Sequence, residues 1–338
     1  MPPGPSRGFA GGLVVLAGCL VLNTVLGPLG TGAVDYPISA TMENQLRGLE
    51  LVTVLLVVPW LVATAVLSWR RHPAATLLAI GPAGYAAYMF VQYVLGPEYA
   101  AYSWAVLFHL AIASLAGALG VVAWQRAGGQ PVPDLTRTQR RRRALLMFAL
   151  AGFVLLRYTP AIVGAVDGSR IADEFQDART FFWSIVLLDL GVVVPATVAA
   201  GVALLRGTPG GDRASYAVLG WFALVPPSVA AMAVVMLVRD DPYASLATTA
   251  LLTVASVVFA GATVAMFRPL LRGRSATGVG LGGLEAPEDA GIDRLDVTDV
   301  DELQPPAGLH AGDLPLSTSL SDAPPAPQVL DEVDHRAP

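Results

Sequence analysis

The sequence has few charged residues, no lysine and a single cysteine. Only 14% of its 338 residues are charged, whereas 54% are hydrophobic and the mean hydropathy is +0.58. Soluble domains carry about 25% charged residues, so this composition excludes an ordinary soluble domain and indicates a membrane protein. With Cys19 alone, an intrachain disulfide is excluded. We interpret the exclusive use of arginine as a coding bias rather than as a sign of arginine-specific binding.

The sequence also lacks the motifs of the common catalytic and metal sites. It contains no metal-ligand spacing, phosphate-binding loop, nucleophile elbow or paired-carboxylate site. A haem within the membrane would usually need a second axial ligand, and the apolar stretches contain no histidine besides His109. We therefore expect no enzyme activity, no cofactor and no metal site.

Eight apolar stretches are long enough to cross a membrane, because about 20 residues of helix span a hydrocarbon core of roughly 30 Å. They lie at residues 8–30, 49–69, 73–95, 102–124, 143–165, 180–205, 214–238 and 243–267. The sequence therefore predicts an all-α integral membrane protein with eight transmembrane helices.

The distribution of arginine between the two sets of connections predicts the topology. One set holds 14 arginines: Arg7, Arg70, Arg71, Arg126, Arg137, Arg140, Arg141, Arg142, Arg143, Arg206, Arg213, Arg268, Arg272 and Arg274. The other set holds four: Arg47, Arg170, Arg179 and Arg239. Because cytoplasmic flanks retain positive charge, we predict a multi-pass protein of the cell membrane with both termini in the cytoplasm. The run Arg140–Arg143 fits this rule, and we expect it to contact anionic lipid but not nucleic acid.

We divide the chain into three regions. Residues 1–142 form a first four-helix membrane unit with a basic cytoplasmic loop, and residues 143–274 form a second four-helix membrane unit. Residues 275–338 contain 13 acidic residues and two arginines without an apolar period. Such a segment cannot bury enough apolar surface to fold, so we predict an acidic, disordered cytoplasmic tail.

The two membrane units carry signs of an internal repeat. The segment Pro28–Asp35 matches Pro160–Asp167 at five of eight positions, with a constant offset of 132 residues. Pro59 and Pro195 each precede an arginine by 11 residues. These matches predict a four-plus-four duplication. Since four spans is an even number, the two units would be parallel repeats about an axis along the membrane normal.

Three ionisable residues lie deep in the predicted spans: His109, Arg157 and Asp189. Charged groups at this depth are costly, so each requires a partner or a function. Arg157 and Asp189 lie at one level on neighbouring spans, and the repeat aligns them with the uncharged Val25 and Thr53. We therefore predict an Arg157–Asp189 ion pair, which is either a structural clamp or part of a substrate or proton-coupling mechanism.

Further polar residues share this level in the outer half of the membrane. His109 either hydrogen-bonds to a neighbouring helix or takes part in proton transfer or ligand contact. The candidate intramembrane polar site consists of Glu50, Gln92, His109, Arg157 and Asp189. Its residues favour a transporter-like or small-ligand-binding protein. The alternative is a scaffold or sensor whose acidic tail recruits a cytoplasmic partner, in which case the helices pack shut around these side chains.

One resemblance accompanies these features. The segment Asp189–Pro195 is followed by Leu204, Leu205 and Arg206, and the third span contains Tyr85, Tyr88 and Tyr93. With these residues the chain resembles a family of polytopic prokaryotic membrane proteins that carries no assigned function. The resemblance covers mainly spans two to eight. It implies an integral membrane protein and no particular site.

Overall fold

The structure is a computed structural model that describes residues 7–130 and 132–272. The first half of this part contains helices α1 (Arg7–Leu26), α2 (Ala40–Val52), α3 (Val58–Trp69), α4 (Ala75–Leu95) and α5 (Trp104–Ala127), with a π-helical segment η1 (Thr53–Val57) between α2 and α3. The second half contains α6 (Arg137–Arg157), α7 (Thr159–Asp167), a short 3₁₀ turn η2 (Asp173–Phe175), α8 (Arg179–Leu188), a π-helical segment η3 (Asp189–Val193), α9 (Val194–Leu205), α10 (Pro209–Phe222), α11 (Val225–Val238) and α12 (Leu246–Arg272). The predicted tail, residues 275–338, lies outside the described residues.

Seven or eight helices of the described part could span a membrane, and the sequence predicts eight. Seven continuous or nearly continuous helices are long and apolar enough to cross a membrane. The pair α6 and α7, bent by 40° at its junction, completes eight if it is one span. The chain is therefore a polytopic, helical membrane protein in its described part.

Side-chain caps fix where several of these helices begin. Ser39 and Ser103 accept hydrogen bonds from backbone N–H groups in the first turns of α2 and α5. Thr136 and Gln139 form a reciprocal capping box at the start of α6. Because the first N–H groups of a helix have no partner within it, such caps define the boundaries of the spans.

Proline explains the irregular points within the spans. Pro160 lacks the N–H that would continue the ladder of α6, and its ring clashes with the preceding turn, so the helix bends before α7. Pro59 and Pro195 lie at the second positions of α3 and α9, directly after η1 and η3. The wider π-helical turn gives the proline ring the space that an α-helical turn would not.

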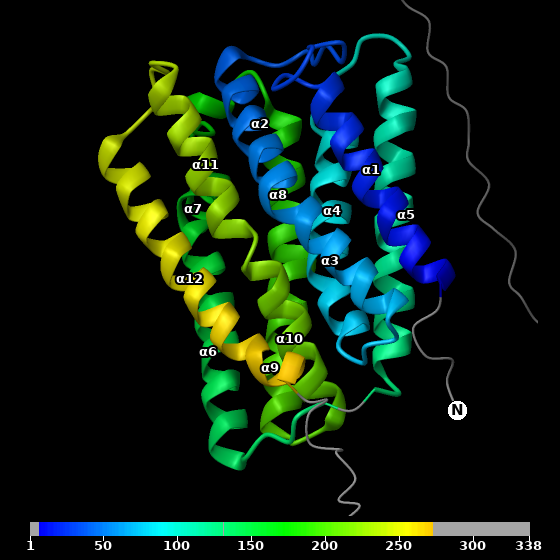
Figure 1. Ribbon diagram of the computed structural model, residues 1–338. Coiled ribbons are helices and arrows are strands. Elements are labelled where there is room, and N and C mark those ends of the chain that lie inside the picture. Colours follow the sequence, from blue (N-terminus) through cyan, green and yellow to red (C-terminus); the bar gives the residue numbers. More distant parts are fainter. Residues whose placement is uncertain (1–6, 131, 273–338) are drawn as a thin grey trace, which may run out of the picture. The chain divides into compact units, whose positions relative to one another are not determined.

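The helices pack in pairs, some within one half of the chain and some between the two halves (Figure 1). Within the halves, α1 packs on α3 and α6 packs on α9, while α4 packs on α5 and α11 on α12. Between the halves, α2 packs on α11, and α4 packs on both α8 and α10. Two clusters of buried apolar side chains result, one mainly from residues 9–123 and one mainly from residues 127–270.

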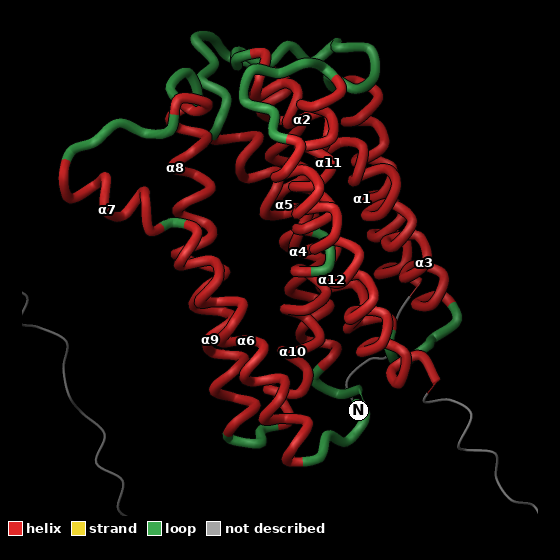
Figure 2. The backbone as a smooth tube through the Cα atoms, turned by 90° about the vertical axis from the view of Figure 1, so that its left-hand side faces the viewer, coloured by secondary structure: helices red, strands yellow, loops and turns green. Residues whose placement is uncertain are grey.

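Helices α7 and α12 are the least covered parts of the bundle. Helix α7 has no buried residue, its Val166 is 86% exposed, and it leans away from the other helices in Figure 2. Only 6% of the apolar window of α12 is buried. Such apolar surface is expected where a helix faces lipid, because the bilayer is itself apolar.

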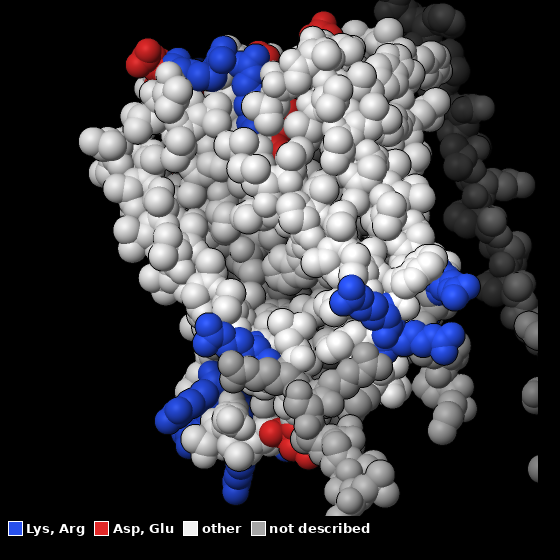
Figure 3. All heavy atoms as spheres, viewed as in Figure 1, with Lys and Arg blue, Asp and Glu red and all other residues white. Residues whose placement is uncertain are grey.

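Charged side chains gather near the two ends of the helices (Figure 3). On the face shown, arginines lie mainly at one end, the acidic residues are concentrated at the other, and a broad band between them carries little charge. We refer to these as the arginine-rich end and the opposite end. The uncharged band is what a bilayer core requires of a surface that it contacts.

Candidate functional site

Asp189 is the centre of the polar contacts in the second half. It is the first residue of η3 and is 6% exposed. Its Oδ1 accepts a hydrogen bond from the Tyr88 hydroxyl at 2.7 Å, and its Oδ2 accepts one from the Tyr158 hydroxyl at 2.6 Å. Hydroxyl-to-carboxylate bonds of this length are strong, so two tyrosines satisfy both oxygens of a buried carboxylate without a cation.

The predicted Arg157–Asp189 ion pair is wrong. Residues 7–130 and 132–272 contain two ion pairs, Glu43–Arg47 and Arg140–Asp212, and neither involves Arg157 or Asp189. Arg157 is exposed, and its guanidinium lies 5.6 Å from the ring centroid of its neighbour Tyr158. Adjacent residues point about 100° apart around a helix, so the depth of Arg157 was a poor guide to its direction. Tyr158, one residue later, faces Asp189 instead.

The first half has a polar residue at the equivalent backbone position. Thr53 begins η1 as Asp189 begins η3, and its hydroxyl donates to the carbonyl of Leu49 at 2.8 Å. The N–H groups of Val58 and Val194 bond to the carbonyls of Thr53 and Asp189 in the same way. The alignment of Thr53 with Asp189, made from the sequence, therefore matches the backbone geometry.

Glu50 lies in a separate polar cluster, against the end of α1. It is 1% exposed, and its Oε2 accepts a hydrogen bond from the backbone N–H of Leu29 at 2.9 Å. Gly27 gives the carboxylate its space, because a Cβ at that position would lie 2.0 Å from Oε1. That oxygen is buried and has no hydrogen-bond partner among the described residues. Glu50 thus joins α2 to the turn after α1.

His109 belongs to the same cluster and is completely buried. Its Nε2 lies 3.0 Å from Asn23 Oδ1 and 3.2 Å from the Tyr36 hydroxyl, and its ring stacks on that of Tyr36. The expectation that His109 bonds to a neighbouring helix is confirmed, since Asn23 lies on α1. Burial raises the pKa of Tyr36, in the connection after α1, so its hydroxyl stays protonated. Gln92 is buried nearby on α4, which also carries Tyr93 beside the His109 ring.

The cluster around Glu50 is closely packed. Asn23, Glu50, Thr53, Tyr85 and Tyr93 contribute to the lining of a cavity of about 10 Å³. Such a volume admits about one water molecule at most. The first-half cluster therefore has space for a bridging water but not for an organic ligand.

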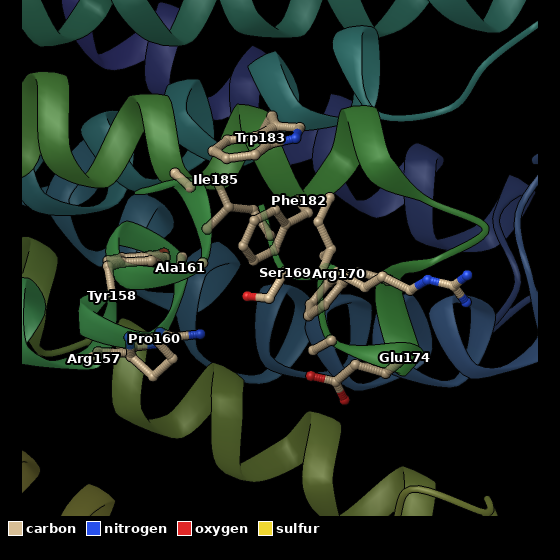
Figure 4. Close-up of a pocket in the computed structure, with 15 residues that line it drawn as sticks. Arg157, Tyr158, Pro160, Ala161, Ser169, Arg170, Glu174, Phe182, Trp183 and Ile185 are labelled. Atoms are coloured by element: carbon tan, nitrogen blue, oxygen red, sulfur yellow. The ribbon is translucent and has the colours of Figure 1, made fainter. Parts of the chain in front are cut away.

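A much larger cavity lies at the opposite end, between α6, α7 and α8 (Figure 4). Its volume is about 470 Å³, within the range of small-molecule pockets. Tyr158, Phe175, Phe182 and Trp183 supply aromatic surface, and its charged lining residues are Arg157, Arg170 and Glu174.

We call this cavity the outer pocket, after the topology predicted from the sequence. Its charged side chains point in different directions. Figure 4 shows the Glu174 carboxylate turned toward the other lining residues and the Arg170 guanidinium turned away from them. Burial raises the pKa of Glu174, and the nearby charge of Arg157 offsets part of that rise. Arg157 and Glu174 therefore act on each other electrostatically without forming an ion pair.

Comparisons with family models, with curated proteins and with solved structures returned no match. The functional argument therefore rests on the geometry of this chain.

The five predicted site residues do not share one cavity. Glu50 lines the small cavity and Arg157 lines the outer pocket, and the two cavities have no lining residue in common. Asp189 touches the outer pocket indirectly, through Tyr158. Their side chains fall into two clusters on either side of helix α4, with Tyr93 facing His109 and Tyr88 facing Asp189.

Sequence reasoning missed Tyr158 and Glu174 as site residues. Tyr158 follows Arg157 directly and therefore lies at almost the same predicted depth as Asp189. The depth argument considered only charged partners for Asp189 and did not consider the tyrosine hydroxyl. Glu174 lies in the connection after α7, and the repeat predicted from the sequence would align it with Glu43. The tyrosines of the third span were noted as a pattern, and the structure gives Tyr85, Tyr88 and Tyr93 three different polar partners or neighbours.

Proposed function

We propose that the protein is a transporter-like or receptor-like membrane protein that binds a small zwitterionic ligand with an apolar group in the outer pocket. One observation carries this proposal: a cavity of about 470 Å³ holds Arg157 and Glu174 beside aromatic side chains. A guanidinium matches a ligand carboxylate, and the carboxylate of Glu174 matches an ammonium group. Phe182 and Trp183 supply a wall for the apolar group.

Arg157 and Glu174 do not neutralise each other in an ion pair, which supports a ligand that carries both a positive and a negative charge. Arg157 and Glu174 face a common cavity and lack an ion pair among the described residues. A purely anionic ligand would leave Glu174 repelled, and a purely cationic one would leave Arg157 repelled. A zwitterion satisfies both side chains.

Tyr158 offers a route from ligand binding to the helix bundle. It lines the outer pocket and donates to Asp189, which in turn accepts from Tyr88 on α4. A ligand that displaces the Tyr158 ring would therefore disturb the hydrogen bond between the junction of α6 and α7 and the π-helical segment η3. This coupling favours a binding protein that changes conformation.

Three matched probes test the proposal on the full chain in lipid nanodiscs. Phenylalanine carries both charges and an aromatic ring, 3-phenylpropanoate lacks the ammonium group, and phenethylamine lacks the carboxylate. We expect phenylalanine to raise the melting temperature most. If none of the three binds, or if the two singly charged probes bind as well as phenylalanine, the zwitterion proposal is refuted.

Two variants assign the charges. We expect Arg157→Gln to weaken phenylalanine and phenylpropanoate binding by about tenfold or more, since charged hydrogen bonds contribute roughly 1.5–3 kcal/mol, and to spare phenethylamine. Glu174→Gln should weaken phenylalanine and phenethylamine and spare phenylpropanoate. Arg239→Gln, at the same end but outside the pocket, is the control. Binding of the ammonium group should also fail as the pH falls through the raised pKa of Glu174.

A scaffold or sensor is the second candidate function, and the packing around Glu50 favours it. Glu50 and His109 are closed off from any space larger than one water, as expected if these groups only lock helices together. In this case the acidic tail would recruit a cytoplasmic partner. Binding of the full chain, but not of a chain ending at residue 279, to a cytoplasmic protein would support this function, provided that the three probes do not bind.

We also propose that the eight spans are a four-plus-four parallel repeat with both termini in the cytoplasm of a cell-membrane protein. Equivalent pairs support the repeat: α1 packs on α3 as α6 packs on α9, and α2 packs on α11 as α8 packs on α4. Helices α4 and α10 cross between the halves at Gly81 and Gly220, where a pseudo-twofold axis would pass.

A further inference from the structure

A second large cavity lies at the arginine-rich end, between the start of α6 and the end of α9. Its volume is about 670 Å³. Arg137, Arg140, Arg141 and Arg206 line it together with Leu204 and Leu205. We call it the basic cavity. None of its described lining residues is acidic.

The run of arginines at residues 140–143 divides into structural and unpaired side chains. Arg140 binds Asp212 through Nε and Nη2, the latter at 2.7 Å. Arg143 donates to the hydroxyls of Ser215 and Tyr216 and lies 4.5 Å from the Tyr216 ring centroid. These two arginines hold α6 against α10 and are not available to a ligand.

Three arginines of the basic cavity remain for a ligand. Arg137, Arg141 and Arg206 are exposed and have no hydrogen-bond or ion-pair partner within residues 7–130 and 132–272. Arg137 and Arg141 lie on α6 and Arg206 directly follows α9, so their charges line one space instead of spreading along one helix face. Like charges held together in this way favour a multivalent anion.

The apolar part of the cavity indicates where the anion comes from. Leu205 is 58% exposed and ends a span of 27 residues, Arg179–Leu205. The cavity therefore lies where the hydrocarbon core meets the headgroup layer. A free phosphate needs no apolar wall, whereas a lipid presents a phosphate and an acyl chain at this level.

We propose that the basic cavity binds the phosphate headgroup of an anionic phospholipid, with Arg137, Arg141 and Arg206 as the phosphate ligands and Leu205 beside the acyl chain. The planar guanidinium donates two parallel hydrogen bonds to phosphate oxygens, which ammonium groups cannot do. This site differs from the lipid contact that the sequence predicted at the run Arg140–Arg143. Arg140 and Arg143 already bind other side chains of the protein.

The test measures lipid binding to the full chain in detergent by native mass spectrometry. Phosphatidylglycerol, phosphatidylcholine, glycerol 3-phosphate and inorganic phosphate are the probes. We expect phosphatidylglycerol to bind more tightly than phosphatidylcholine, and glycerol 3-phosphate and inorganic phosphate to bind weakly. Equal binding of phosphatidylglycerol and phosphatidylcholine, or a phosphate affinity equal to that of phosphatidylglycerol, would overturn a lipid site.

Two triple variants with equal loss of charge locate the binding. The variant Arg137→Gln, Arg141→Gln, Arg206→Gln should weaken phosphatidylglycerol binding by about tenfold or more, as expected for several interfacial charges. The control Arg70→Gln, Arg71→Gln, Arg142→Gln removes three arginines of the same end that do not line the cavity, and should bind normally. Equal losses in both would show only general charge attraction and would refute the site.

A third variant keeps the test decisive if the first fails to fold. The variant Arg137→Lys, Arg141→Lys, Arg206→Lys preserves the charge but removes the forked donor. We expect an intermediate affinity, above that of the glutamine variant and below that of the native chain. An affinity equal to the native one would refute the assigned role of the guanidinium groups.

Discussion

Replacing Tyr158 with phenylalanine removes one hydroxyl from the Asp189 site and leaves the aromatic ring in place. The lost bond is 2.6 Å long and ends on a carboxylate that is 6% exposed. Oδ2 of Asp189 would then be a buried, unpaired acceptor, while Oδ1 keeps its bond to Tyr88. Tyr158→Phe therefore deletes one interaction between the junction of α6 and α7 and the segment η3.

The expected loss of stability depends on which class of hydrogen bond this is. Neutral interhelical bonds in membranes contribute on average about 0.6 kcal/mol, whereas bonds to charged groups contribute about 1.5–3 kcal/mol. The acceptor here is a buried carboxylate without an ion-pair partner in the described residues, so the larger class applies. We expect Tyr158→Phe to lower the free energy of unfolding by about 2 kcal/mol.

Unfolding of the purified chain in mixed micelles by increasing sodium dodecyl sulfate measures this loss. Arg157→Gln is the matched control, because Arg157 is adjacent, exposed and has no ion-pair partner among the described residues, and it should change stability by less than about 0.5 kcal/mol. Asp189→Thr copies Thr53 of the first half, and in that background Tyr158→Phe should cost about 1 kcal/mol less. If Arg157→Gln costs as much as Tyr158→Phe, or if the double change is additive, the tyrosine–carboxylate reasoning is refuted.

Three further predictions concern packing, topology and the tail. Gly81→Ala should destabilise by about 1–3 kcal/mol, because its Cβ would lie 2.7 Å from a backbone carbon of α10, whereas Gly117→Ala, with open space, should be neutral or stabilising in the same unfolding assay. Reporters fused after Ser169 and after Thr208 should be external and cytoplasmic, respectively, and a shared side would contradict eight spans. Deleting residues 280–338 should leave membrane insertion and melting temperature unchanged, and a large loss of folded yield would contradict an independent tail.

The spans could be predicted because the apolar runs leave few alternatives. The stretch 102–124 became α5, Trp104–Ala127, and the stretch 180–205 became α8, η3 and α9. A run of that length and hydropathy satisfies its backbone polar groups inside a membrane only as a helix. The polar level stays a prediction, which rests on helical rise converting residue number into depth.

Partners within the polar level could not be predicted in the same way. Depth fixes one coordinate of Arg157 and Asp189, but their directions depend on helix rotation, which packing sets. The bend before Pro160 and the wide turn at Asp189 both change that rotation. Apolar sequence carries little information on either feature, so the tyrosine that replaces Arg157 as the partner emerged only from the structure.

The π-helical segments η1 and η3 set the direction of the polar side chains, because each segment adds one residue to a helical turn. Each holds a turn with i to i+5 bonding, which contains one residue more than an α-helical turn. Deleting one residue from either segment would restore an α-helix and rotate the part before it by about 100° relative to the part after it, with a shift of about 1.5 Å. Glu50 would then turn away from Leu29, and Asp189 from Tyr88 and Tyr158. Gain or loss of one residue in these turns, rather than a substitution, is thus the change that would redirect both clusters while leaving every side chain chemically intact.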